Sequence, residues 1–262
     1  MTPSTVAVRT LIDDTLGILG DLSIAEWSID SGCRGWRIQD LITHMGFFLH
    51  TIADPRLVLP ANPDGTTESL NDAAVQERAD WSPEQAREYY TLQAEAGMHA
   101  LAALQEEPLR SKMIRLGELG SYRLAQLADA VAFDHLVHLT SDLLVPHGPV
   151  ARRVSTTVAI DPAIDWMLAG LPQMCQRRLH LVLGKEPVGV RLVGETARAF
   201  LLSRAGDAVV LTETTDLPAD TATTKATDFL RWATKRSAWR PVVEIAGRRE
   251  RVVPVLDAIR VV

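Results

Sequence analysis

The sequence predicts an α+β protein with a helical N-terminal half and a mixed C-terminal half. Apolar residues recur at three- and four-residue steps through most of the first 145 residues, which is the spacing of amphipathic helices. After residue 180, short apolar runs are separated by Gly and Asp, a pattern typical of strands. Pro146, Gly148 and Pro149 cluster between the two patterns. We therefore expect two domains, residues 1–150 and 151–262.

The first domain is predicted to hold four long helices. The best-marked start is Ser82-Pro83-Glu84-Gln85, with Ser82 as N-cap, Pro83 at the first helical position and Gln85 completing a capping box. A shorter helix is expected around 71–79, after a loop at 56–68. The long helices are expected at about Thr5–Leu19, from Trp36 to before Asp54, from Pro83 to about Gln105, and at about Tyr122–Leu144. Joined by loops, they are expected to form an antiparallel four-helix bundle.

The second domain is predicted to combine helices with a sheet. Its helices are expected at about Ala163–Val182, Thr224–Lys235 and Pro254–Ile259. Its strands are expected at Val188–Leu192, Ala199–Leu202, Ala208–Thr212 and Val242–Ile245.

Composition narrows the function. A net charge of −6 and a pI near 5.7 give no electrostatic basis for nucleic-acid binding. No apolar run is long enough for a membrane span, and no secretory signal is visible, so we expect a cytoplasmic protein that binds no membrane. Residues 225–251 carry eight basic against three acidic side chains. They form either a solvated face or a patch that meets an anionic small molecule.

Two cysteines cannot form a disulfide framework, and a cytosolic protein would keep both reduced. Cys175 is expected to be a small buried apolar residue. Cys33 lies in the turn SGCRGW just ahead of a helix, which places it nearer a pocket.

One set of side chains suggests a metal site. His44 lies on the apolar stripe of its helix, and Asp134 and His138 are four apart on another, so both project from one face. Two imidazoles and a carboxylate in a bundle would hold a divalent metal and leave one position open. Zinc is preferred, although nickel, iron and manganese also suit N and O ligands. His135 competes with His138 but points about 100° away from Asp134.

Spacing alone does not decide the matter. An Asp/His pair four apart is more often a surface or capping interaction, and a lone histidine on an apolar face is usually a core residue.

Two stretches resemble the DinB-like (YfiT-like) metal-binding bundles: AEWSIDSGCRGWRIQDLITHM and DHLVHLTSDL. Their order and their separation of about 90 residues also fit. The second half is similar, more loosely, to the sterol-carrier-like α/β domain of mycothiol-dependent maleylpyruvate isomerases. The resemblance implies a DinB-like bundle followed by a smaller α/β domain.

By this resemblance His44 and His138 match two metal ligands. Asp134 takes the place of the usual Glu, so its bond to the metal is either closer or through water. Asp40 and Asp142 are candidates to orient an imidazole N–H, although Asp40 alternatively serves the first turn of its helix.

The family's catalytic arginine matches Arg236, with Arg231 and Arg240 as alternatives. Lys235 stands where the family more often has Gly.

The resemblance implies mycothiol as cosubstrate. The favoured hypothesis is a metal-dependent thiol transferase acting on an electrophilic small molecule. One alternative is maleylpyruvate cis–trans isomerisation, and another is a binding protein without turnover. We expect a monomer or homodimer whose partners are a small-molecule electrophile and a low-molecular-weight thiol.

Overall fold

The computed structural model describes residues 1–261 and shows a mixed helix-and-sheet protein, as the sequence predicted. The chain divides into two compact units, Met1–Ala163 and Ile164–Val262. The division falls within a helix, and the domain boundary predicted at 150/151 stays a prediction. Among the described helices, none combines the length and apolar character that crossing a bilayer requires.

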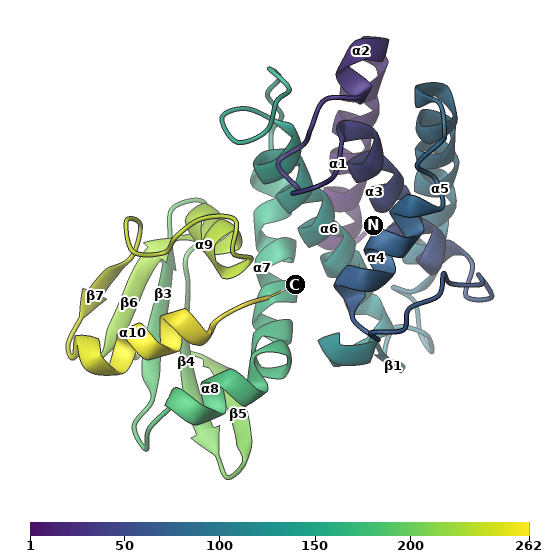
Figure 1. Ribbon diagram of the computed structural model, residues 1–262. Helices are drawn as coiled ribbons and strands as arrows, with labels where there is room; N and C mark the ends of the chain where they lie inside the picture. Colours follow the sequence, from purple (N-terminus) through teal and green to yellow (C-terminus); the bar gives the residue numbers. More distant parts are fainter. Residues whose placement is uncertain (262) are drawn as a thin grey trace. The chain divides into compact units, whose positions relative to one another are not determined.

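The first unit is almost entirely helical (Figure 1). Within it α1 packs against α5 and α6, and α3 packs against the same two helices. Its elements are α1 (Pro3–Asp21), α2 (Ile24–Trp27), α3 (Ile38–Ala53), α4 (Thr67–Gln76), α5 (Pro83–Ala103), β1 (Met113–Arg115), η1 (Gly117–Leu119), β2 (Ser121–Arg123), η2 (Leu124–Gln126), α6 (Leu127–Val137) and η3 (His138–Leu143). Helix α7 (Thr157–Met174) begins in this unit and ends in the second.

Apolar side chains on the inner faces of these helices form the core of the unit. Leu11 and Ile12 of α1 are fully buried, as are Leu41, Ile42 and Met45 of α3. Both sets recur at the three- and four-residue steps that the sequence showed, so the apolar stripes do face inward.

The start of α5 confirms the predicted capping box. Ser82 Oγ accepts a hydrogen bond from the backbone N–H of Gln85, and Gln85 Oε1 accepts one from the N–H of Ser82. Pro83 occupies the first turn, where a missing N–H costs nothing.

The helix predicted over Tyr122–Leu144 is wrong at its start and irregular at its end. Tyr122 belongs to β2, which pairs antiparallel with β1, and the regular helix begins only at Leu127. The short hairpin turns through Gly117 and Gly120, both at positive φ, where glycine is favoured.

From His138 onward the same helix widens into the π-helical turn η3. Leu144 N–H bonds the carbonyl of Leu139 five residues back. Single π turns are rare and occur often at functional sites.

The second unit is built on a five-stranded sheet with the order β5-β4-β3-β6-β7. β3 runs parallel to β6, and every other neighbouring pair is antiparallel. The strands are β3 (Val188–Val193), β4 (Arg198–Ala205), β5 (Ala208–Glu213), β6 (Thr221–Lys225) and β7 (Glu244–Ala246).

Three helices accompany the sheet: α8 (Gln176–Val182), α9 (Ala226–Ala233) and α10 (Arg249–Ala258). α9 contacts β3 and β6, α10 contacts β3 and β7, and Figure 1 shows α8 and α10 in front of the strands. Phe229 and Trp232 of α9 are buried and meet edge to face with ring centroids 5.1 Å apart.

Three predicted helices of this unit need correction, and the one expected at Pro254–Ile259 begins earlier, at Arg249. The helix expected at 163–182 is interrupted at Cys175, which separates α7 from α8. The helix expected from Thr224 begins at Ala226, because Thr224 belongs to β6. Cys175 itself is fully buried, as predicted.

Candidate metal centre

The first side chain of the site, His44, lies in the middle of α3. Asp40 fixes the beginning of this helix: its carboxylate accepts hydrogen bonds from the backbone N–H and the guanidinium of Arg37, at 2.8 to 2.9 Å. Of the two roles considered for Asp40, the structure therefore shows the one at the first helical turn, and its carboxylate does not orient the imidazole of His44.

α3, α6 and the π turn η3 bring His44, Asp134 and His138 together. Asp134 Oδ1 lies 3.3 Å from His44 Nε2 and 3.5 Å from His138 Nε2. One ligand atom from each of the three residues lies within 4.8 Å of the others. The two imidazoles meet edge to face, with ring centroids 5.0 Å apart. His44 therefore meets Asp134 and His138, which lie 90 and 94 positions further along the sequence, as the helical spacing together with the family resemblance led us to expect.

Several polar atoms of this cluster are buried without a hydrogen bond. They include Asp134 Oδ2 and His44 Nδ1. Buried polar atoms without partners cost free energy and are uncommon, and these two belong to side chains whose other polar atoms, Asp134 Oδ1 and His44 Nε2, contact each other. Two imidazole nitrogens and a carboxylate oxygen are a donor set that zinc and related divalent ions accept. The residues therefore fit a metal of this class.

The charges of the metal-free cluster follow from its burial. Burial raises the pKa of Asp134, but the charge of His138 and the contacts with His135, His138 and His44 outweigh burial and hold the pKa well below its usual range. Burial lowers the pKa of His138, but the Asp134 charge and the bonds to Asp134 and Asp142 raise it well above its usual range. Burial lowers the pKa of His44, so that ring is neutral near pH 7.

Asp142 orients the second histidine. Its Oδ2 lies 2.8 Å from His138 Nδ1, so this nitrogen carries the proton and donates it to the carboxylate. The Nε2 atom then faces His44 and Asp134. His138 and Asp142 both belong to the π turn η3. A carboxylate behind a ligating imidazole is a common arrangement in metal sites.

Cys33 also lies beside His138, with Sγ 3.7 Å from Nδ1. The sequence had placed Cys33 near a pocket but had not connected it to a histidine. The turn SGCRGW gave a hint, because it directly precedes the helix that carries His44.

The contact between His135 and Asp134 was not expected from the sequence. It is fully buried, neither ring nitrogen has a hydrogen-bond partner, and its Nδ1 lies 3.3 Å from Asp134 Oδ2. The helical angle of about 100° was read as separating the two side chains. Adjacent residues on a helix can still meet when one side chain turns toward the other, and the orphaned carboxylate oxygen shows where that contact is needed.

Arg236 lies in the second unit, directly after α9. The end of α9 has the two backbone bonds of a Schellman motif: Lys235 N–H to Trp232 O and Arg236 N–H to Arg231 O, both 3.0 Å. Lys235 has φ of +62°, the left-handed conformation that glycine adopts without strain. The family's glycine before the arginine thus has a structural reason.

The other candidates in the basic run are engaged elsewhere or partly buried. Arg240 pairs with Asp257 at 3.2 Å and lies over the ring of Trp239. Arg231 has a buried Nε without a hydrogen bond. Arg248 and Arg251 both bind Asp220 and Glu186, acids outside the run. Much of the local positive charge is therefore compensated.

Together these observations define a mixed helix-and-sheet protein whose helical unit carries a buried His–Asp–His cluster. A family model described as the mycothiol maleylpyruvate isomerase N-terminal domain matches residues 8–141, just over half of the chain. The chain belongs to this family. Among curated proteins, none matches the sequence.

Two solved structures share the fold. They are crystal structures of the mycothiol-dependent maleylpyruvate isomerase and of a histidine-to-alanine mutant of it. Each has a TM-score of 0.57 and 14% sequence identity, and the match covers 94% of this chain and 93% of the other. At this identity the likeness is one of fold.

Proposed function

We propose that this chain is a metal-dependent thiol transferase that uses mycothiol, with His44, Asp134 and His138 as the metal ligands. The observation that carries the proposal is the convergence of these three side chains, whose ligand atoms lie within 4.8 Å of one another. The family match supports mycothiol as the thiol, because the description of the family model names it. In this reading the packed helices α1, α3, α5 and α6 form a DinB-like bundle, and the second unit is the sterol-carrier-like domain.

A divalent metal of the zinc class, when bound, would supply the positive charge that favours the thiolate form of a thiol beside it. The chain's own residues prepare the ligand atoms. Asp142 accepts a hydrogen bond from the Nδ1–H of His138, so in the neutral ring Nε2 offers its lone pair. The ring of Trp36 packs 5.0 Å from that of His44 and restricts its rotation. Burial of His44 keeps it neutral and available as a ligand.

Arg236 is proposed to bind a carboxylate of the electrophilic substrate. A guanidinium offers two parallel N–H donors, which match a carboxylate and would also stabilise negative charge developing on the substrate. The thiolate would add to an activated carbon of that substrate, and the thioether bond formed would remain in the product of a transferase.

Isomerisation is the second candidate, and the shared fold with an isomerase favours it. Both reactions begin with thiol addition to a double bond. In an isomerase the thiol leaves again after rotation about the former double bond, so mycothiol is regenerated.

The two are separated by incubating the metal-loaded protein with mycothiol and unsaturated carboxylic acids, and following products by mass spectrometry. A stable thioether adduct supports the transferase. A geometric isomer with unchanged mycothiol supports the isomerase. If neither forms with any electrophile, and the protein binds the acid without turnover, the non-catalytic binding reading replaces both.

Arg236→Ala is expected to raise KM for a carboxylated substrate at least about tenfold, because a charged hydrogen-bonded contact contributes roughly 1.5–3 kcal/mol. Metal content is expected to stay unchanged. Arg240→Ala is the comparison variant, since Arg240 is an alternative arginine of the same basic run and pairs with Asp257. If Arg236→Ala and Arg240→Ala have the same KM for the carboxylated substrate, Arg236 is not the residue that contacts the carboxylate.

A further inference from the structure

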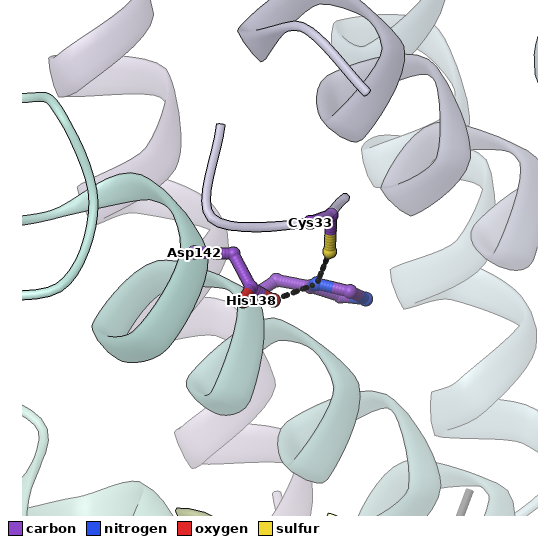
Figure 2. Close-up of side chains that lie close together, drawn as sticks. All are labelled: Cys33, His138 and Asp142. Carbon is purple, nitrogen blue, oxygen red and sulfur yellow. Dashed lines mark hydrogen bonds and ion pairs between the residues drawn. The ribbon is translucent and has the colours of Figure 1, made fainter. Parts of the chain in front are cut away.

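A second group of metal-ligating atoms lies on the other side of the His138 ring. Figure 2 shows Cys33 and Asp142 on the same side of the imidazole, with both dashed lines meeting at Nδ1. Nε2 belongs to the cluster with His44 and Asp134. Since the two nitrogens of an imidazole point in different directions, the two groups share one residue without sharing a donor atom.

The position of Cys33 beside this ring is fixed by the backbone. Gly32 N–H donates to the carbonyl of Asp142 at 2.7 Å, which ties the turn to η3. A β-carbon on Gly32 would lie 2.7 Å from Asp142 Cα, so only glycine permits this approach. The N–H of Cys33 is itself 3.1 Å from Ser31 Oγ. The thiol is therefore held next to the imidazole and the carboxylate by the fold of the turn.

The donor atoms have distances close to those around a zinc ion. Bonds of about 2.3 Å to sulfur and about 2.0–2.1 Å to nitrogen, at tetrahedral angles, place S and N about 3.6 Å apart. Cys33 Sγ and His138 Nδ1 are 3.7 Å apart. His138 Nδ1 and Asp142 Oδ2 are at 2.8 Å, so this pair would open by roughly half an ångström. All three ligand atoms lie within 4.8 Å of one another.

We propose that Cys33 Sγ, His138 Nδ1 and Asp142 Oδ2 form a second site for a divalent transition metal of the zinc class, bridged to the first by His138. The ion replaces the proton that Nδ1 otherwise donates to Asp142. Binding releases that proton and the thiol proton of Cys33 to solvent, while the carboxylate contributes an oxygen. The ring bound through both nitrogens is an imidazolate, and zinc accepts thiolate, histidine nitrogen and carboxylate ligands.

The second site fills after the first, because its ion must displace the shared proton of His138. Cys33 is only partly buried, which leaves a route for the ion from solvent. The proposal rests on the proposed function only through His138, which belongs to both donor sets. The simpler alternative is that Asp142 orients His138 and that Cys33 is merely adjacent.

The test is a titration of the metal-free, full-length protein with Co²⁺, a spectroscopic substitute for zinc. Bound metal is counted by equilibrium dialysis, and sulfur ligation is read from near-ultraviolet charge-transfer absorption. Cys33→Ser removes the proposed thiolate at nearly constant volume. Cys175→Ser is the matched control, because Cys175 is buried in the second unit, where its Sγ contacts the backbone of Arg260.

Two equivalents in the wild type support the proposal, provided that the charge-transfer band grows with the second and survives in Cys175→Ser. Cys33→Ser is then expected to bind one equivalent without the band and to hold a second at least about tenfold more weakly. One equivalent without a band overturns the second site and leaves the proposed function standing. One equivalent whose band persists in His44→Ala overturns the two-site arrangement and, with it, the proposed catalytic ligands. No bound metal overturns both.

Discussion

The carboxylate of Asp134 has one oxygen between His44 and His138 and the other beside His135. The first oxygen is the one that the proposed metal would take. The second is buried without a hydrogen bond, next to a buried ring whose nitrogens also lack one. A small rotation of either side chain would join them. Asp is one methylene shorter than the family's usual Glu, so such support from His135 would matter more here.

His135 is accordingly expected to position Asp134 for metal binding. His135→Leu removes the donor and should weaken metal affinity about 10- to 100-fold, the range found when hydrogen-bond partners of ligands are lost. His135→Asn keeps an N–H near the place of Nδ1 and should recover part of the affinity. Competition with a chelator measures both, and circular dichroism checks that each variant folds. If His135→Leu and His135→Asn bind the metal with the same affinity, His135 serves only the core.

The ion pair between Asp134 and His138 predicts how stability of the metal-free protein depends on pH. The folded pKa of His138 is raised, so its contribution is complete below the unfolded value of about 6.5 and is lost as pH rises through the folded value. The folded pKa of Asp134 is lowered, so its contribution is present above about 3.9 and is lost as pH falls through the folded value.

The free energy of unfolding of the metal-free protein should therefore decline on the alkaline side of about pH 6.5. Urea denaturation at a series of pH values measures this. In His138→Gln the alkaline decline should be smaller, because the shifted group is gone. A wild-type curve that rises between neutral and alkaline pH would show that His138 is not held as a cation by Asp134.

At the scale of elements, the motif that ends α9 holds one non-glycine residue, Lys235, in a left-handed conformation. The Schellman motif requires a left-handed residue at position 235, and this chain supplies lysine. A left-handed conformation costs a non-glycine residue about 1–2 kcal/mol. Replacing that residue by glycine removes this cost, but part of the gain in stability is lost because glycine makes the unfolded chain more flexible.

Lys235→Gly should consequently raise the free energy of unfolding by about 0.5–1 kcal/mol. Lys235→Ala keeps the β-carbon and should bring no such gain, which makes it the matched control. Urea denaturation compares the two. A glycine variant no more stable than the alanine variant would mean that the left-handed residue is not strained in solution.

The elements that could be predicted are those with long, regular patterns. The capping box at Ser82 and the apolar stripes of α1 and α3 were sufficient to place three helices. β6 was missed because its sequence, TATTK, has no apolar alternation and runs directly into a helix. The hairpin of β1 and β2 was missed because Tyr122 continues the apolar pattern of α6, and only the glycines at 117 and 120 mark the turn.

The three candidate ligands and the partner Asp142 could be predicted from the sequence, but the geometry around them could not. His44, Asp134 and His138 were identified by helical spacing and by resemblance, and they do converge. The π turn that aligns Asp142 with His138 has no sequence pattern of its own. The approach of Cys33 depends on a backbone contact at Gly32 between segments more than 100 residues apart. Such tertiary contacts are invisible to periodicity.

At the scale of the whole molecule, each unit carries some of the residues named in the proposed function. The helical unit holds the His–Asp–His cluster, and the second unit holds Arg236. The chain belongs to the mycothiol maleylpyruvate isomerase family by its first unit, and the shared fold extends over nearly all of it. The central claim nevertheless concerns the metal site alone. Without a bound metal, the proposed mechanism has no positive charge that would favour the thiolate form of mycothiol.

The most direct test is metal analysis of the purified protein by plasma mass spectrometry, comparing wild type with Asp134→Ala after reconstitution with equimolar Zn²⁺. Asp129→Ala is the matched control, since Asp129 lies on the same helix and accepts a hydrogen bond from Ser4. We predict about one equivalent in the wild type and in Asp129→Ala, and little in Asp134→Ala. Equal metal in all three, or none in any, would contradict the assignment of His44, Asp134 and His138 as a metal centre.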